Sequence, residues 1–410
     1  MEWKLSELSV DGKGHYGIGA PAIPYDKNKP TYLRITDIND DGTINFLDLK
    51  SVDDEDSNKY LLKENDIVFA RTGNSTGRSY FYQKEHGDFV YAGFLIKFSI
   101  DPQKVNPKIL KYYTHSQEYY NWVKSFDTGG TRGNINAKTF GDMPISLPKR
   151  CVQDKIVGIL SALDAKIENN NKINANLEAQ AEALFKSWFV DFTPFKDQPF
   201  VNSELGHIPQ GWKVEKINDL DLYITDFVSN GSFASLKQNV TLYSDENYAF
   251  FIRNTDLKEG RFRAYVDKSS YFFLKKSVLH GGEIIISNVG DVGSVNLCPK
   301  LNKPMTLGNN IIMLKSEDEA THNFLYILFK WSYGKSLIKS ITGGSAQPKF
   351  NKGDFKSLKI IMPTGKKLSD FNLIASSLLK KIEEFKEENQ RLAALRDTLL
   401  PKLMSGEIKL

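Results

Sequence analysis

Two long stretches of the chain carry apolar residues at alternating spacings of four and three, the pattern of a helix that buries one stripe against a second helix. The first stripe reads Ile156, Leu160, Leu163, Ile167, Asn170, Asn174, Leu177, Ala181, Leu184 and Trp188. The second reads Ile374, Leu378, Ile382, Phe385, Asn389, Leu392, Leu399 and Leu403. Both are longer than the stripes of ordinary globular helices, which favours two paired helices over helices that each lie on their own globule.

The segment ahead of each stripe has a different pattern, in which short apolar runs alternate with turn residues. The runs that predict strands are Ile67–Ala70, Phe89–Ile100, Ile284–Ser287 and Asn310–Leu314. One amphipathic helical stretch is expected in each segment, over Pro107–Phe126 and His322–Ile341. These patterns predict an α+β protein in which two mixed α/β globules alternate with two long helices. A proline-containing stretch, Asp191–Trp212, is typical of a semi-rigid connector.

The chain repeats one unit twice. Three runs recur in order: Tyr32–Ile38 as Phe251–Leu257, Asp66–Gly73 as Glu283–Gly290, and Thr128–Thr131 as Thr342–Ser345. Phe140 and Pro148 recur as Phe355 and Pro363, so the offset drifts from about 219 to 215 residues along the chain, as loop insertions would make it do. We therefore expect a pseudo-two-fold duplication with a first globule at 1–150, a helix at 151–191, a linker and second globule at 192–365, and a helix at 366–410.

Two asparagines, Asn174 and Asn389, occupy the same place in the two copies of the helix. A polar residue at a position that faces the partner helix lowers stability but fixes the register of the pair. We expect Asn174 and Asn389 to set the register of an antiparallel coiled coil.

Composition and charge exclude several classes of protein. The net charge is +4, and residues 1–150 carry as many basic as acidic side chains, so no segment is basic enough for tight non-specific binding to phosphates. Cys151 and Cys298 cannot form a disulfide framework, and the N-terminus lacks the pattern of a signal peptide. A reducing, cytoplasmic location is expected.

Motifs of catalysis and cofactor binding occur only in unsuitable contexts. The dinucleotide fingerprint at Gly12–Gly17 precedes several prolines, where no helix can begin. The nucleophile-elbow spelling at Gly73–Gly77 precedes a predicted strand rather than a helix, and the six histidines form no metal-binding pattern. We expect no catalytic residues, no metal and no cofactor.

Polar loops flanked by glycines stand in equivalent places of both copies. The residues with side chains or backbone suited to DNA are Arg34, Arg71, Thr72, Asn74, Ser75, Arg78, Gly129, Gly130, Thr131, Arg132 and Asn134 in the first copy, and Arg253, Asn254, Asn288, Gly343, Gly344, Ser345, Gln347 and Lys349 in the second. Arg, Asn and Gln can bond base edges in pairs, while Ser and Thr suit phosphates. The alternative is a set of ordinary solvated hairpins. Divergence at the loop tips, such as Arg71 against Asn288, favours two readers of different short sequences.

Three phrases carry a resemblance to a known family: Leu184–Phe192 (LFKSWFVDF), Gly206–Trp212 (GHIPQGW) and Leu400–Ile408 (LPKLMSGEI). The whole chain resembles the specificity (S) subunit of type I restriction–modification systems. The resemblance implies two target-recognition domains, two antiparallel helices and no catalysis by the chain itself. It also implies two adenine-methyltransferase (M) subunits and restriction (R) subunits as partners on double-stranded DNA. A departure lies at Pro148–Gln153, where family members often have a second proline.

From the residues and the resemblance we expect a sequence-specific DNA-binding subunit. Each globule would recognise one half of a bipartite site, and the helices would set the gap and dock the methyltransferase subunits. The alternative is a helical scaffold that joins other proteins and does not bind DNA.

Overall fold

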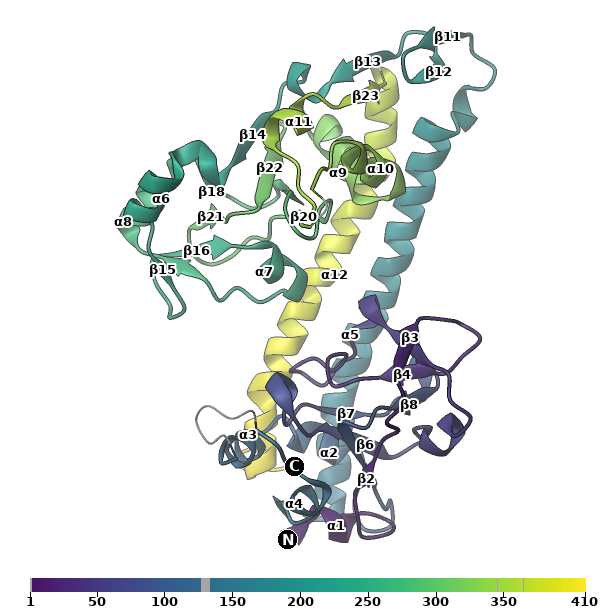
Figure 1. Cartoon of the computed structure of the whole chain (residues 1–410), viewed down its shortest axis with the longest axis vertical. Coiled ribbons are helices and arrows are strands. Elements are labelled where there is room, and N and C mark those ends of the chain that lie inside the picture. Colours follow the sequence, from purple (N-terminus) through teal and green to yellow (C-terminus); the bar gives the residue numbers. More distant parts are fainter. Residues whose placement is uncertain (1, 127–132, 345, 364) are drawn as a thin grey trace. The chain divides into compact units, whose positions relative to one another are not determined.

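The computed structural model describes residues 2–126, 133–344, 346–363 and 365–410. The chain divides into two compact units (Figure 1): unit 1 comprises residues 1–170 and 386–410, and unit 2 comprises residues 171–385. Each unit therefore combines one globule with parts of both long helices.

Unit 1 contains two four-stranded sheets and one strand pair. The first sheet has the order β2 (His15–Tyr16), β9 (Leu95–Ser99), β6 (Asp66–Ala70) and β7 (Ser79–Phe81), all antiparallel. The second has the order β3 (Ala22–Pro24), β5 (Lys50–Val52), β4 (Thr31–Leu33) and β8 (Phe89–Tyr91), with β4 and β8 parallel. β1 (Glu2–Lys4) pairs with β10 (Pro144–Ser146). Its short helices are α1 (Leu5–Leu8), α2 (Ile109–Tyr113), α3 (Gln117–Lys124) and α4 (Ala137–Gly141).

Unit 2 repeats this plan. One sheet has the order β14 (Tyr223–Asp226), β22 (Ile311–Lys315), β19 (Ile284–Ser287) and β20 (Val295–Leu297). The other has the order β15 (Leu242–Tyr243), β17 (Tyr265–Val266), β16 (Ala249–Ile252), β21 (Met305–Leu307) and β18 (Val278–Leu279), again with one parallel pair, β16 and β21. β13 (Lys213–Lys216) pairs with β23 (Lys359–Met362), as β1 does with β10. The helices are α6 (Phe233–Asn239), α7 (Asn254–Glu259), α8 (Lys268–Phe273), α9 (Glu319–Lys330), α10 (Ser332–Ser340) and α11 (Lys352–Lys356), and the connector forms a hairpin of β11 (Phe200–Ser203) and β12 (Gly206–Pro209).

The α+β class and the internal duplication are confirmed, while three local expectations were wrong. The run Phe89–Ile100 forms two strands in different sheets, because the chain turns after Ala92, whose carbonyl accepts a hydrogen bond from Leu95 N. The helical stretch at 107–126 is broken between α2 and α3, where the Ser116 side chain caps α3 by accepting from Tyr119 N at 3.2 Å. The stretch at 322–341 is broken between α9 and α10, because Trp331 is extended.

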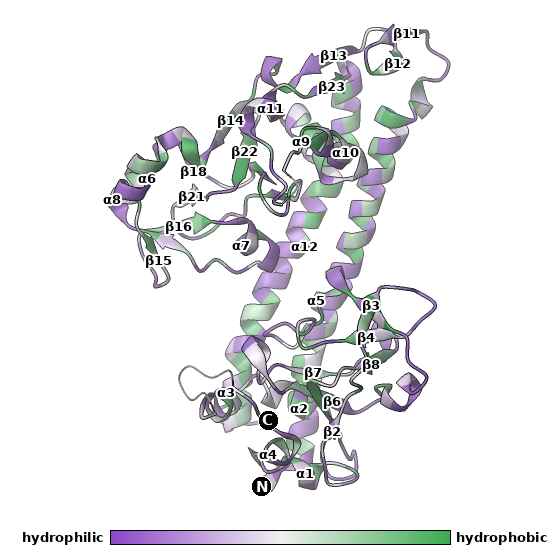
Figure 2. Cartoon of the chain, viewed as in Figure 1, coloured by the Kyte–Doolittle hydropathy of each residue, from purple (hydrophilic) through white to green (hydrophobic). Residues whose placement is uncertain are grey.

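The long helices α5 (Arg150–Phe185) and α12 (Lys366–Ser405) pair within each unit, and Figure 2 shows mixed hydrophobic and hydrophilic positions along both. In unit 1, Asp164 bonds Arg396 and Asn170 bonds Asn389. In unit 2, Asn174 bonds Ile382, and the ring of Phe185 lies against that of Phe371. Rising numbers on α5 meet falling numbers on α12, so the pairing in each unit is antiparallel.

The buried stripes agree with the apolar pattern except at the start of α12. Ile156, Leu160 and Asn170 have no exposed surface, whereas Ile374 is 45% exposed. Phe371 and Ala375 are buried in its place. Phe371 is buried because its ring packs against the rings of Phe189 and Phe185, at centroid distances of 4.7 Å and 6.3 Å.

The asparagines of the helix pair are buried with incomplete hydrogen bonding. Asn170 donates to Glu388 Oε2 at 2.8 Å and to Asn389 Oδ1 at 2.9 Å, and Asn174 donates to the Ile382 carbonyl at 3.3 Å. The side-chain oxygens of Asn170 and Asn174 are buried and accept no hydrogen bond from any described residue. An unsatisfied buried carbonyl lowers stability, which is the cost expected of a residue that fixes register.

We expect Asn174→Leu to stabilise unit 2 by roughly 1 kcal/mol, because leucine removes the unsatisfied oxygen and adds apolar contact. Calorimetric thermal unfolding would show a higher midpoint. Asn176→Leu, the same change on the exposed face of α5, is the matched control and should leave the midpoint nearly unchanged. A lower midpoint for Asn174→Leu would contradict this account of the buried amide.

Candidate nucleic-acid interface

In both units, the same pair of backbone hydrogen bonds holds two loops side by side, and we call this arrangement the backbone frame. In unit 1, Arg71 follows β6; its N–H donates to the Phe94 carbonyl at 3.0 Å, and its carbonyl accepts from Ile135 N at 2.9 Å. In unit 2, Asn288 follows β19 and makes the same two bonds, to the Asn310 carbonyl and from Phe350 N, each at 3.1 Å. The loop after the central strand is thereby fixed to the loop that precedes the next helix.

The loop ahead of each helix ends in an asparagine cap. The Asn136 side chain accepts from Thr139 N at 2.9 Å at the start of α4, and the Asn351 side chain accepts from Asp354 N at 2.9 Å at the start of α11. The first loops turn at glycines of positive φ, 77° for Gly73 and 78° for Gly290. Since glycine adopts this conformation without steric cost, the repeated glycines make the two frames alike.

The expected contact residues that follow β6, together with Asn134, have defined surroundings in unit 1. The Arg71 guanidinium lies over the ring of Tyr16, 5.0 Å from its centroid, and donates to Asn134 Oδ1 at 3.5 Å. Arg78 is ion-paired with Asp40 at 2.7 Å and also donates to the Ile38 carbonyl at 3.0 Å. Ser75 is buried, whereas Asn74 and Asn134 are exposed and Thr72 is half-buried. Among these, Asn74, Asn134 and Arg71 are the side chains best presented to a ligand.

Arg34 and Arg253 hold turns in their own units. The Arg34 guanidinium bonds both oxygens of Asp37, at 2.6 Å and 3.0 Å, and Arg253 bonds Asp256 at 2.6 Å and 2.8 Å. The hydrogen bonds that each guanidinium donates to its buried carboxylate are the main reason that the guanidinium pKa is raised in both residues. Sequence reasoning placed both arginines among the DNA contacts; a contact there remains a prediction, and it would have to compete with these ion pairs.

The expected contact residues of unit 2 lie on a short backbone hairpin. Gly343 and Lys349 exchange two backbone hydrogen bonds of 2.9 Å, and Gln347 lies exposed between them with Gly344. Asn288 donates its side chain to the Phe350 carbonyl at 3.2 Å, and Asn254 donates to Asp291 at 3.4 Å. The remaining expected contacts lie outside the described residues: Gly129, Gly130, Thr131, Arg132 and Ser345.

Two residues near these loops were missed by sequence reasoning. Tyr16 and Asp226 end equivalent edge strands, since Tyr16 pairs with Ile96 on β9 and Asp226 pairs with Ile312 on β22. Tyr16 lies in the glycine motif Gly12–Gly17, which was considered only as a cofactor site, and Asp226 belongs to no repeated run or glycine loop. In unit 2, Asp226 also lines a cavity of about 460 Å³ whose walls include Phe233, Asn288 and Lys352.

The comparison with protein families shows to which family the chain belongs. The family model described as the type I restriction modification DNA specificity domain matches twice, over residues 23–179 and 209–392. The chain belongs to this family of specificity subunits. The two matches cover both copies of the repeat, and they support a function in DNA sequence specificity while giving no support to a scaffold that does not bind DNA.

Individual relatives agree with the family match. The chain is 26% identical over 414 residues to the "Type I restriction enzyme HindI specificity subunit" of Haemophilus influenzae, with 85% of this chain and 88% of the relative covered. It is 29% identical over 309 residues to the "Type I restriction enzyme MjaIX specificity subunit" of Methanocaldococcus jannaschii, with 73% and 68% covered. The crystal structure of the S subunit from M. genitalium shares the fold, with a TM-score of 0.52, 17% identity, and 98% and 96% coverage.

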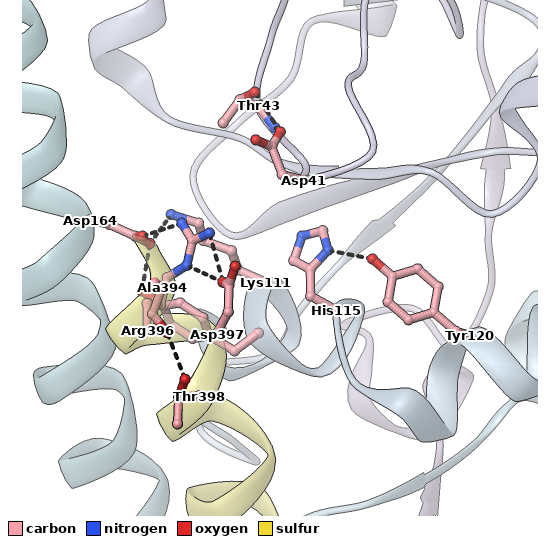
Figure 3. Close-up of polar contacts among 11 residues, drawn as sticks. Asp41, Thr43, Lys111, His115, Tyr120, Asp164, Ala394, Arg396, Asp397 and Thr398 are labelled. Atoms are coloured by element: carbon pink, nitrogen blue, oxygen red, sulfur yellow. Dashed lines mark hydrogen bonds and ion pairs between the residues drawn. The ribbon is translucent and has the colours of Figure 1, made fainter. Parts of the chain in front are cut away.

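In this specificity subunit a partly buried ionic cluster joins the first globule to both helices of unit 1 (Figure 3). Asp164 of α5 accepts hydrogen bonds from Lys111 Nζ at 2.6 Å, Tyr112 OH at 2.9 Å and Arg396 Nη1 at 3.0 Å. Burial alone would raise the pKa of Asp164, but Lys111 and Arg396 outweigh it and the carboxyl pKa is below its usual value. Beside the cluster, burial lowers the pKa of His115 to about 4, so its imidazole is neutral at physiological pH.

Unit 2 of the specificity subunit joins its globule to the helices through aromatic rings. Phe185 and Phe189 of the first helix pack against Phe324 of α9, at centroid distances of 5.6 Å and 4.9 Å, and Phe189 packs against Trp212 at 5.6 Å. These contacts bury apolar area instead of pairing charges. Among the described helices, none is long and apolar enough to cross a membrane.

Proposed function

We propose that this specificity subunit reads a bipartite DNA sequence, with residues 1–150 and 192–365 each recognising one half-site. The observation that carries the proposal is the shared frame with different side chains: Arg71 in unit 1 stands where Asn288 stands in unit 2, on the same pair of backbone hydrogen bonds. Arginine suits guanine and asparagine suits adenine, so equivalent loops with these residues read different bases.

The loop residues divide into two groups by the bonds that they can make. Arg71, Asn74, Asn134, Asn288, Gln347 and Lys349 carry the side chains that bond base edges, and the glycines and hydroxyl residues around them suit the sugar–phosphate backbone. Arg132, Thr131 and Ser345 belong to the same loops by sequence. Base contacts at these positions would be read in the major groove, where each base pair has its own pattern of donors and acceptors.

The long helices have two roles in the proposal. Residues 151–191 and 366–410 set the number of unread base pairs between the half-sites, and they dock two adenine-methyltransferase subunits, to which restriction subunits are added in the full complex. Asn174 and Asn389 fix the register on which that gap depends. Catalysis then belongs to the partner subunits, and the chain itself needs no cofactor.

The charge distribution agrees with a reader that acts inside a complex. Residues 1–150 carry no net charge, so this segment contributes little non-specific attraction to phosphates. Partner subunits bound to the same DNA would supply that attraction, and the loops would supply selectivity.

Exchanging residues 1–150 for those of a relative should change one half-site of the methylated sequence and leave the other unchanged, because each globule carries its own loops. The measurement is long-read methylation sequencing of a methylation-free host that expresses the chimera with the cognate methyltransferase subunits. The reciprocal exchange of residues 192–365 is the matched control and should change the other half only. A change in both halves from either exchange would refute independent reading.

A further inference from the structure

Arg71 has a partly exposed guanidinium, and no carboxylate in the described part of the chain neutralises it. Arg34, Arg78 and Arg253 each form an ion pair with an aspartate. Among the described residues, none forms an ion pair with Arg71, whose side chain contacts the ring of Tyr16 and the amide of Asn134 instead. Its Nε is buried and has no hydrogen-bond partner among the residues that the structure describes. The described contacts therefore hold the positive charge of Arg71 in place, and none of them is with a carboxylate.

Tyr16 is itself fixed at both ends. Its backbone belongs to β2, paired with Ile96 of β9, and its hydroxyl accepts a hydrogen bond from Ala137 N at 3.1 Å. Ala137 is the first residue of α4, so this bond satisfies one of the free N–H groups that every helix start leaves. The ring is 43% exposed and tied to both the sheet and the second loop. It forms a rigid surface under the guanidinium.

Unit 2 changes both members of this pair together. Asn288 replaces Arg71, and Asp226 replaces Tyr16 at the same strand position. Asp226 makes different contacts, because its carboxylate accepts from Ser229 N at 2.9 Å and from Lys352 Nζ at 3.0 Å. The tyrosine thus occurs only in the unit whose equivalent loop carries an arginine, Arg71.

We propose that Tyr16 is a positioning residue that orients Arg71 toward a guanine in the first half-site. The inference rests on the proposed function and names the residue pair that gives unit 1 its specificity. A stacked guanidinium presents its N–H groups in a fixed fork, which matches O6 and N7 of guanine. Because the ring holds the side chain before DNA binds, less conformational entropy is lost on binding.

The test uses the full chain in its complex with the cognate methyltransferase subunits and duplexes that carry the methylated sequence of the wild type. Tyr16→Ala should weaken binding to this duplex about tenfold, the scale of a partly desolvated cation–π contact. Tyr16→Phe keeps the ring and should restore most of the affinity. Tyr25→Ala removes another exposed tyrosine of unit 1 and is the matched control, with affinity close to wild type.

A double-mutant cycle separates positioning from a general structural role. In the Arg71→Ala background, Tyr16→Ala should cause little further loss of affinity, because the residue that it positions is gone. Methylation sequencing of Tyr16→Ala should show relaxed selection at one base of the first half-site and an unchanged second half-site. Equal losses in both backgrounds, or relaxation in both half-sites, would overturn the inference.

Failure of this inference can be told from failure of the proposed function. If Arg71→Ala leaves the first half-site unchanged, the Tyr16–Arg71 pair does not read DNA and the inference falls. The exchange of residues 1–150 would still test independent reading of the half-sites, since it replaces every loop of the first globule at once.

Discussion

Asp164→Ala will lower the free energy of unfolding of unit 1 by about 2 to 3 kcal/mol, less than the loss seen when one partner of a fully buried ion pair is removed, because this cluster is only partly buried. The Asp164 side chain is 16% exposed and holds Lys111 and Arg396. Without it, two partly buried cations face each other and the Tyr112 hydroxyl loses its acceptor. Urea denaturation monitored by tryptophan fluorescence would measure the loss.

The pH dependence of this effect has a definite sign. The pKa of Asp164 in the folded chain is below its usual value of 3.8, so its contribution is complete above about pH 5 and disappears as the pH falls through the folded pKa. The difference between wild type and Asp164→Asn should therefore stay constant from pH 8 to about pH 5 and shrink in more acidic buffer. Asp154→Asn removes an exposed ion pair of the same helix. It should change the free energy of unfolding little at any pH in this range. A gap between wild type and Asp164→Asn that widens in acid would contradict the assignment.

Deleting four residues from each long helix should shorten the unread gap by about one base pair without changing either half-site. Suitable segments are Ala175–Glu178 of α5, which directly follows Asn174, and Leu378–Lys381 of α12, which directly precedes Ile382. Asn174 and Ile382 are hydrogen-bonded to each other. Four residues turn an α-helix about 40° beyond a full turn, and one base pair turns B-DNA by about 35°. After the deletion, each globule would therefore face the same side of the DNA groove at a position one base pair closer to the other half-site.

Methylation sequencing measures the gap directly in the deleted variant. Removal of the four residues from α5 alone is the informative comparison, because it leaves the facing apolar residues of α12 out of register and should reduce stability. Asn176→Ala and Lys380→Ala together, without deletion, should keep the wild-type gap. If the paired deletion leaves the gap as it is, the helices do not set it.

Local patterns predicted the parts of the fold that depend on neighbours in sequence. The runs Ile67–Ala70 and Ile284–Ser287 became buried strands because apolar residues of high β-propensity favour a sheet interior. The glycines that follow them, Gly73 and Gly290, adopt the positive φ that the turn requires. Repetition of these signals in both copies made the duplication visible without any knowledge of tertiary structure.

Contacts between residues distant in sequence could not be foreseen in the same way. Asp164 and Arg396 meet because two helices pair, and Lys111 joins them from a third element. The sequence pattern predicted Arg34 as a DNA contact, but in the structure Arg34 forms an ion pair with Asp37, three residues later. Tyr16 stands in a two-residue strand whose partner is β9, so its place under Arg71 depends on the sheet and not on its neighbours.

The composition of unit 1 has a consequence for synthesis on the ribosome. Its core includes Leu400 and Leu403, which are 6% and 3% exposed and pack with residues from the first half of the chain. Unit 2 ends at residue 385, so all of its residues emerge earlier. At about 5–20 residues per second, translation of residues 386–410 takes about one to five seconds, during which the first globule still lacks this helix segment. Unit 1, whose globule precedes unit 2 in the chain, is thus the later of the two units to complete its hydrophobic core.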